Sequence, residues 1–371
     1  MSQLFSPLQL DALTLPNRIV IAPMCQYSAD GAGNMTDWHL IHLGQLALSG
    51  AGLLIIEATA VEAIGRITPA DVGLYDDDNQ AAIARVLKAV RQHSRMPIAI
   101  QLAHAGRKAS SHVPWDGGQC LAPGEGAWQT VSSSALPHAA GEPAPVALDD
   151  AGLARVKAAF VQAAQRAHAL GIDAIELHGA HGYLLHQFLS PIANQRSDRY
   201  GGSLENRMRF PLEVFEAVRA AVPAGMPVGV RISATDWVEG GWDIDSSIAF
   251  AKALAAHGCS FVHASSGGVS PQQKIPLSPG YQVPLAERLK AALDVPVFAV
   301  GLITEAKQAE AVIAAGQADA VAIARAALFE PHWPWRAAAE LGAQVEAPPQ
   351  YWRSQPRDQK ALFGEARIGA R

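Results

Sequence analysis

The chain has 371 residues, 49% of them hydrophobic, and a formal net charge of −5, so it can bury a large core. It contains no run of Lys and Arg and no apolar stretch of the roughly 20 residues that a membrane span needs, which excludes a nucleic-acid or membrane partner. No secretory signal pattern opens the chain. Cys25, Cys120 and Cys259 are odd in number and far apart, which argues against disulfides and favours the reducing cytoplasm.

Eight short runs rich in Val, Ile and Ala alternate with longer helical patterns. The runs are almost continuously hydrophobic, which is typical of parallel strands covered by helices on both sides. They span residues 18–23, 52–58, 97–102, 174–180, 227–233, 260–266, 296–301 and 319–325.

Helix signals occupy the segments between these runs. Asp149 and Asp150, for example, open a helical pattern that stops at Gly171, as acidic N-termini and terminal glycines do. Eight strand–helix units without an edge strand predict a closed (β/α)₈ TIM barrel, with residues 1–371 forming one domain. The expected helices span residues 36–49, 76–94, 148–170, 204–222, 243–257, 284–293, 304–315 and 333–341.

Three segments depart from the repeating unit. Residues 6–16 precede the first strand and predict a small hairpin that closes the barrel floor. Residues 103–147 interrupt the third unit with little periodicity, and an insertion of that length usually forms a capping lid. The tail, residues 342–371, either wanders or reaches a neighbouring protomer.

Function in such a barrel is expected where strands end and loops begin. The first strand ends at residues 22–24, followed by Cys25 and Tyr27. The Cys25 thiol either contacts a cofactor or acts as a nucleophile, or it is a small buried residue. Tyr27 either donates a hydrogen bond into the pocket or caps it. Gln101 ends the third strand, where its amide pairs with the edge of a heterocycle or with core backbone.

The fourth strand ends in a pair of histidines. His178 and His181, with glycines between and after them, can hold one oxygen with two N–H donors, as an oxyanion hole does. Alternative roles are metal ligation or packing, but no third ligand follows at metal spacing, so no metal is expected. Tyr183 follows directly, where its phenol is either a proton donor or a packing group.

We call the end of the barrel where the strands run into these loops the mouth. Two arginines and a glycine at further strand ends are also expected there. Arg231 lies among apolar neighbours on the fifth strand and needs either a carboxylate or an anionic cofactor edge as its partner. Gly301, Ala324 and Arg325 end the last two strands, where barrels typically bind phosphate. Arg325 offers two parallel donors for that purpose.

Several longer motifs occur in a fixed order. They are Asn17-Arg18-Ile19 before Ala22-Pro23-Met24-Cys25, Gln101 with His104-Ala105-Gly106-Arg107, His178-Gly179-Ala180-His181-Gly182-Tyr183, Gln187-Phe188-Leu189-Ser190-Pro191, and Arg196-x-Asp198-x-Tyr200-Gly201-Gly202-Ser203-x-Glu205-Asn206-Arg207. In this order the chain resembles, from end to end, the old yellow enzyme family. It is most similar to the thermophilic-like class of bacterial ene-reductases, which includes enoate and xenobiotic reductases.

The resemblance implies a non-covalent FMN cofactor with NADPH or NADH as hydride donor. Gly301, Ala324 and Arg325 would hold the phosphate, although the family often has Gly where this chain has Ala324, whose methyl crowds the backbone approach slightly. Gln101 would pair with the pyrimidine edge, and Arg231 would stabilise negative charge on the reduced ring. The residues expected to line the ring system are Ala22, Pro23, Met24, Cys25, Ala58, Gln101 and Arg231.

The mechanism implied by the resemblance is a two-step hydride transfer. A hydride passes to flavin N5, and then to the β-carbon of an alkene whose activating oxygen is bound by His178 and His181. Tyr183 would protonate the α-carbon, Cys25 would tune the flavin and touch substrate, and Tyr27 would contact substrate. The expected substrates are activated alkenes such as enones and enals, with maleimides and nitro compounds as further candidates.

The resemblance also gives the tail a role. In this class an aromatic or arginine residue near the C-terminus enters the neighbour's site, and Arg353, with Trp352 as second choice, stands at the matching place. A homodimer or homotetramer with a C-terminal contact follows. Leu302 stands where xenobiotic-reductase relatives have Trp, which should widen the pocket.

Other readings of the barrel fit less well. Iron–sulfur relatives need a cysteine cluster and more length, and an aldolase needs a Schiff-base lysine that none of the eight runs contains. A flavin-free lyase or a non-enzymatic protein that binds a phosphate ligand stays open on the fold alone. The sequence carries no dinucleotide fingerprint that distinguishes NADPH from NADH.

Overall fold

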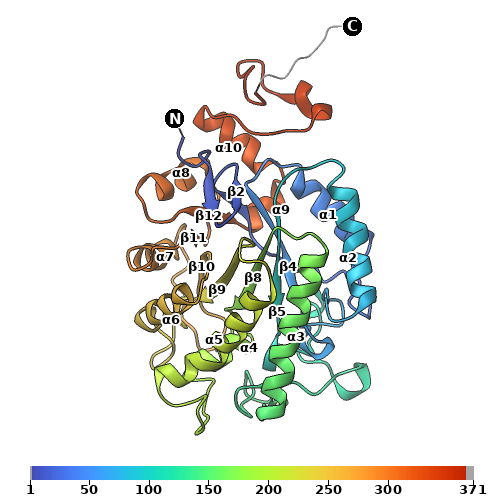
Figure 1. The fold of residues 1–371 in the computed structure, drawn as a ribbon, viewed down its shortest axis with the longest axis vertical. Coiled ribbons are helices and arrows are strands. Elements are labelled where there is room, and N and C mark those ends of the chain that lie inside the picture. The colour runs from blue at the N-terminus through green and yellow to red at the C-terminus, as the bar shows by residue number, and fades with distance from the viewer. Residues whose placement is uncertain (1, 365–371) are drawn as a thin grey trace.

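The computed structural model describes residues 2–364, and eight parallel strands form a closed barrel at its centre (Figure 1). The short, β-branched runs form these strands because both of their faces are buried, one inside the barrel and one under helices. In barrel order the strands are β10 (Val262–Ser265), β11 (Val297–Ala299), β12 (Ala320–Ile323), β3 (Ile19–Ile21), β4 (Leu53–Ala60), β5 (Ile98–Ala103), β8 (Ala174–Gly179) and β9 (Val228–Ser233).

Helices surround the barrel, as the ring of coils in Figure 1 shows. Several begin at a side-chain cap: Asp76, Asp149, Ser203 and Asp243 each accept a hydrogen bond from the third residue onward, which satisfies a free N–H of the first turn. The eight predicted helices correspond to α1 (Asp37–Ala47), α2 (Asp77–Val90), α3 (Asp150–Ala169), α5 (Leu204–Ala221), α6 (Ile244–Ala256), α7 (Val283–Lys290), α8 (Ala306–Ala314) and α10 (Trp333–Leu341).

Two short helices were not predicted. α4 (Leu184–Leu189) follows the histidine pair and is buried over all six residues. α9 (Arg325–Phe329) begins at Arg325, so the last predicted strand is too long because β12 ends at Ile323. β4 instead runs two residues beyond its predicted end, with a register shift between Ile56 and Ala58.

The N-terminal hairpin confirms its prediction. β1 (Leu8–Leu10) and β2 (Leu13–Leu15) pair antiparallel, and Leu8, Leu10 and Leu15 pack into the barrel interior. The same cluster contains Phe261 and Phe298, whose rings stack with centroids 4.7 Å apart. The hairpin therefore closes one end of the barrel with apolar side chains, which leaves the other end for chemistry.

The insertion and the tail lie at opposite ends of the molecule (Figure 1). Residues 103–147 contain three single-turn 3₁₀ helices and a two-stranded parallel pair, β6 (Val131–Ser132) with β7 (Val146–Ala147). The tail follows α10 and forms a 3₁₀ helix over Pro349–Ser354. Within the described residues, no helix is long and apolar enough to cross a bilayer.

Candidate active site

His178 and His181 face each other at the end of β8. His178 Nε2 lies 3.3 Å from His181 Nδ1, and the two rings are nearly perpendicular. His181 has a left-handed backbone with φ +58°, which swings its side chain back toward the strand end. Gly182 makes this turn possible, because a Cβ there would collide with the backbone of Gly268.

Both histidines are neutral at physiological pH. Burial is the main cause that holds each pKa well below its usual value, and the positive charge of Arg231 comes second. The Ala180 N–H donates to His178 Nδ1 at 3.2 Å, so the ring hydrogen of His178 sits on Nε2 and points toward His181. Ser265 Oγ lies 2.7 Å from His181 Nε2. In this geometry His181 Nδ1 accepts from His178 Nε2–H and His181 Nε2–H donates to Ser265, whereas a donating Ser265 hydroxyl would select the Nδ1–H tautomer of His181.

Tyr183 stands against this pair. Its ring meets the His178 ring edge-on with centroids 4.8 Å apart. Burial raises its pKa well above the usual value, so the phenol keeps its proton at neutral pH. Lys108 Nζ lies 5.0 Å from the ring centroid and donates to the carbonyls of His181 and Gly268 at 2.9 and 3.0 Å. A cation in this place favours the phenolate that proton donation would create.

Cys25 and Tyr27 lie on the loop after β3, at the same mouth. Burial, followed by the negative charges of Asp71 and Glu57, raises the pKa of the Cys25 thiol well above its usual value. A protonated thiol is a weak nucleophile, which favours a contact role. Tyr27 has φ +49° and packs its ring edge-on against Trp115 of the insertion, which is 66% exposed.

The barrel interior holds a polar network that the sequence did not reveal. Gln101 Nε2 donates to Glu176 Oε1 at 2.7 Å, and Glu176 Oε2 lies 2.8 Å from His263 Nδ1. All three side chains are buried, on β5, β8 and β10. Because Glu176 accepts from the amide nitrogen of Gln101, the amide oxygen remains available to accept a hydrogen bond.

Arg231 is the buried cation beside this network. It lies on β9, paired in register with His178 on one side and His263 on the other. Only 7% of it is exposed, and its Nε has no hydrogen-bond partner within the described residues. Burial lowers the pKa of this guanidinium. A buried donor without a partner is costly, so the site fits an acceptor-bearing ligand.

The expected phosphate residues follow the neighbouring strands β11 and β12. Gly301 has φ +123°, and a Cβ there would lie 2.7 Å from Gln282 Nε2, so the loop leaves no room for a side chain. Ala324 is the residue before α9, and Arg325 is the first residue of that helix, with an exposed side chain. The three residues sit on adjacent strand ends, as a phosphate site in a barrel requires.

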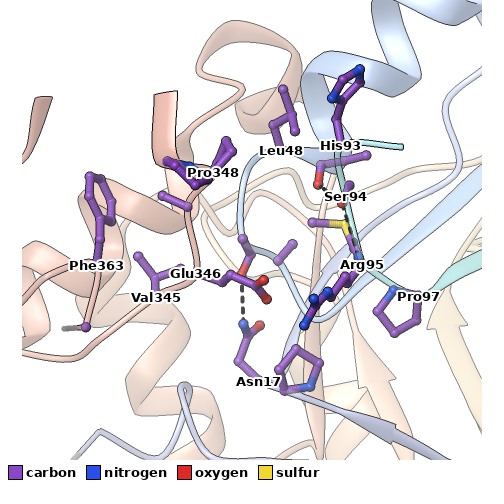
Figure 2. A pocket seen from close by; sticks show the side chains of 18 of the residues that line it. Asn17, Leu48, His93, Ser94, Arg95, Pro97, Val345, Glu346, Pro348 and Phe363 are labelled. Carbon is purple, nitrogen blue, oxygen red and sulfur yellow. Dashed lines mark hydrogen bonds between the residues drawn. The ribbon is translucent and has the colours of Figure 1, made fainter. Parts of the chain in front are cut away.

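Arg353 lies elsewhere. Its 3₁₀ helix belongs to the tail segment that lines a cavity of about 960 Å³ at the barrel floor, together with Asn17, Gly50 and Pro97, which precede barrel strands. Figure 2 shows this cavity, with Val345, Pro348 and Phe363 of the tail facing the floor loops. Arg353 is therefore at the opposite end of the barrel from His178 of its own chain.

Residues 22–24 and Ala58 form part of the wall of the mouth. Ala22 and Pro23 are buried at the end of β3, Met24 is partly buried, and Ala58 is 6% exposed on β4. A single end of the barrel therefore combines apolar walls, neutral N–H donors and one buried cation. Its other residues are Cys25, Gln101, His178, His181, Tyr183 and Arg231. This is the architecture of a barrel enzyme.

Comparison with known proteins identifies the class. The sequence matches the NADH:flavin oxidoreductase / NADH oxidase family over residues 3–344. It is 44% identical over 351 residues to an NADPH dehydrogenase of Geobacillus thermodenitrificans, covering 94% of this chain and 98% of that one. A Listeria innocua NADPH dehydrogenase is 41% identical over 355 residues, covering 95% and 99%. The chain therefore belongs to the NADH:flavin oxidoreductase / NADH oxidase family.

Solved structures agree with this assignment. Morphinone reductase in complex with tetrahydroNAD superposes with a TM-score of 0.75 at 30% identity, covering 93% of this chain and 92% of that one. The old yellow enzyme homologue from Zymomonas mobilis gives a TM-score of 0.75 at 25% identity, covering 97% and 99%. The predicted family and barrel are confirmed.

The protein is thus an oxidoreductase that uses FMN and a reduced nicotinamide and acts on small molecules. This rules out the flavin-free lyase and the non-enzymatic binding protein that the fold alone allowed. The residues present fit FMN, because the unpartnered Arg231 Nε and the oriented Gln101 amide offer a donor and an acceptor at the mouth. Arg325, exposed at the first residue of α9, adds a charged donor for the phosphate.

Proposed function

We propose that this protein is an ene-reductase, which reduces C=C bonds conjugated to a carbonyl or another electron-withdrawing group. The observation that carries the proposal is the neutral His178–His181 pair, with Tyr183 packed against it. Once His181 adopts its Nδ1–H tautomer, the two facing imidazoles offer two N–H donors to one substrate oxygen, and a protonated phenol beside them can supply a proton. We further propose that the whole chain acts as one domain.

In this proposal the chain orients the cofactor with Gln101, Arg231, Cys25, Ala58 and the segment 22–24. Gly301, Ala324 and Arg325 hold the phosphate, with Ala324 still offering its backbone N–H. When bound there, FMN would supply the hydride transfer from NAD(P)H to the C=C bond of the substrate.

The remaining steps belong to the side chains at the mouth. When substrate binds, His178 Nε2–H turns from His181 Nδ1 to the substrate oxygen. His181 then takes its Nδ1–H tautomer, with the Ser265 hydroxyl donating to its Nε2, and supplies the second hydrogen bond to that oxygen. These bonds strengthen as negative charge develops on that oxygen. Tyr183 then gives its proton to the α-carbon, and Lys108 stabilises the phenolate left behind. Tyr27 and Cys25 contact the substrate, and Leu302 in place of a tryptophan leaves the pocket wide.

The tail supports a further part of the proposal. Arg353 cannot reach its own mouth from the barrel floor, so we infer that it, or Trp352, enters the mouth of a neighbouring protomer in a homodimer or homotetramer. The three cysteines are unpaired, which suits the cytoplasm. Sedimentation of the full chain, compared with a truncation at residue 348, tests this part: only the full chain should assemble.

A spectroscopic titration tests the oxygen-binding pair. The FMN-loaded protein is titrated with a simple phenol, and a broad long-wavelength absorption band should appear as the phenolate stacks on the oxidised flavin. His181→Ala should weaken phenol binding by roughly tenfold or more, as the loss of a hydrogen bond to a charged group does. A band of undiminished affinity in this variant would remove His181 from the site.

Stopped-flow mixing tests the proton donor. Reduced enzyme is mixed with a cyclic enone under anaerobic conditions, and flavin reoxidation is followed. Tyr183→Phe should slow this half-reaction by about 10²- to 10⁴-fold, the range for a positioned general acid, and leave flavin reduction by NADPH intact. Equal reoxidation rates in the two proteins would show that another group supplies the proton.

A further inference from the structure

A small cavity lies beside the proposed proton donor. Its volume is about 10 Å³, and Tyr183 and Asp71 both line it, with alanines from the ends of β4 and β5 forming most of the remaining wall. This is about the space that one water molecule occupies. Among the lining residues, Tyr183 and Asp71 are the two whose side chains can form hydrogen bonds with such a water.

Asp71 is a carboxyl group that the proposed chemistry has not used. It is 2% exposed. Thr68 Oγ1 and N donate to Oδ1 at 2.7 and 3.2 Å, and Ile67 N donates to Oδ2 at 2.8 Å. Within residues 2–364 it forms no ion pair with a cation. Hydrogen bonds from its own loop therefore fix the carboxyl, and no counter-charge forces it to remain ionised.

Burial favours the protonated form of Asp71, whereas the hydrogen bonds that it accepts favour the carboxylate. Burial raises its pKa to about 7, and the negative charge of Glu57 on β4 adds to the increase, against the hydrogen bonds of Thr68 and Ile67. Cys25 and Tyr27, after β3, and Tyr183 all feel its charge. A carboxyl group that titrates near neutral pH can both release and regain a proton during turnover.

We propose that Asp71 reloads Tyr183 with a proton through one water molecule held in this cavity. The inference rests on the proposed role of Tyr183 as proton donor. After Tyr183 has given its proton to the α-carbon, the water donates a proton to the phenolate and receives one from the Asp71 carboxyl. Asp71 is left as a carboxylate and regains its proton from solvent. Each alkene reduced thus consumes one solvent proton, which enters behind the substrate.

Geometry explains why such a route is useful. Tyr183 is packed between His178 and Lys108, and the side that faces the mouth is filled by substrate or product. Tyr183 contacts His178 of the oxygen-binding pair and also lines the cavity together with Asp71, so it connects the two. Asp71 is thus a positioning and proton-supplying residue that acts through Tyr183 and does not contact the substrate.

Proton uptake measured beside flavin reoxidation tests the relay. Reduced enzyme is mixed with enone in weak buffer that contains a pH-indicator dye, near neutral pH. In the wild type, uptake should follow reoxidation without delay. In Asp71→Asn, uptake should lag behind reoxidation by roughly tenfold or more, the lower end of the range for a positioned proton-transfer group. If the two signals slow together, or if neither slows, the relay is wrong.

A matched variant separates the relay from a structural role. Thr68→Val removes one hydrogen bond to the Asp71 carboxylate but keeps the carboxyl, so the pH midpoint of fast uptake should move upward, whereas Asp71→Asn should abolish that midpoint. An infrared pH titration of the enzyme without substrate gives an independent readout. A protonated-carboxyl band should titrate near pH 7 and be absent from Asp71→Asn; its persistence in that variant would overturn the proposal.

The two proposals fail in different ways. If Tyr183→Phe reoxidises as fast as the wild type, the proton donor itself is wrong and the relay has nothing to reload. If Tyr183→Phe is slow but Asp71→Asn takes up protons without a lag, the proton donor stands and the relay alone is refuted.

Discussion

Acid should lower the free energy of unfolding of this protein because the buried histidines at the mouth resist protonation. Replacing His178 alone measures the contribution of one of them. Burial, and next the charge of Arg231, hold the folded pKa of His178 well below its usual value, while the unfolded chain protonates it near pH 6.5. Below about pH 6.5 the unfolded chain therefore binds a proton at His178 that the folded protein does not bind. The stability that the folded protein gains from keeping His178 neutral is fully present above about pH 6.5. It is lost as the pH falls from there toward the folded pKa.

The magnitude follows from linkage. One histidine that stays neutral in the folded state costs about 1.4 kcal/mol of unfolding free energy between pH 7.5 and pH 5.5. Urea unfolding of the wild type and of His178→Gln at these two pH values measures it: the variant should lose about 1.4 kcal/mol less than the wild type. Titrating groups far from His178 cancel in this comparison, because their ionisation is the same in both proteins.

A second histidine serves as the control. Burial lowers the pKa of half-buried His42 on α1 to about 4, so His42→Gln should reduce the same pH difference by about 1 kcal/mol after allowance for its partial exposure. If His42→Gln shows its reduction and His178→Gln shows none, then His178 is charged in the folded protein, and the neutral oxygen-binding pair is refuted.

Three further predictions concern the fold and the mouth. Gly301→Ala adds a Cβ 2.7 Å from Gln282 Nε2 at φ +123°, which should cost about 1–3 kcal/mol and weaken FMN binding in a fluorescence titration; unchanged affinity would place the phosphate elsewhere. Phe298→Ala at the barrel floor should cost about 3–5 kcal/mol in urea unfolding, whereas Phe329→Ala, at a side chain 92% exposed, should change stability by less than about 0.5 kcal/mol. Trp115→Ala should raise KM for aromatic enones and leave FMN affinity unchanged, and an unaltered KM would show that the insertion does not touch substrate.

The positions of the strands could be read from the sequence because burial on both faces leaves a continuous apolar run. The mouth could be located because barrel chemistry collects at strand ends. The two short helices could not be predicted from the sequence. α4 is buried on every side and α9 has only five residues, so neither shows an amphipathic period. The extra length of β4 depends on a register shift with β5 that no local pattern records.

The interior polar groups escaped prediction for a different reason. Glu176 and His263 are 87 residues apart in the chain, and each lies in a short, largely apolar strand, so only the closed barrel brings them together. Asp71 stands in a loop with no pattern of its own. Lys108 was within reach of the sequence, because it directly follows the quoted motif that ends at Arg107, and its two carbonyl contacts place it at the mouth.

The N-terminal hairpin, β1 and β2, closes one end of the barrel, so core packing at that end is separate from the chemistry at the mouth. Because Leu8, Leu10 and Leu15 complete the interior core at the floor, cohesion of the core does not depend on the loops at the mouth. The insertion can therefore be shortened, exchanged or randomised to change which molecules the enzyme accepts while the scaffold stays intact. This protein is accordingly suited to laboratory evolution, with libraries directed to residues 103–147 and the hairpin left unchanged.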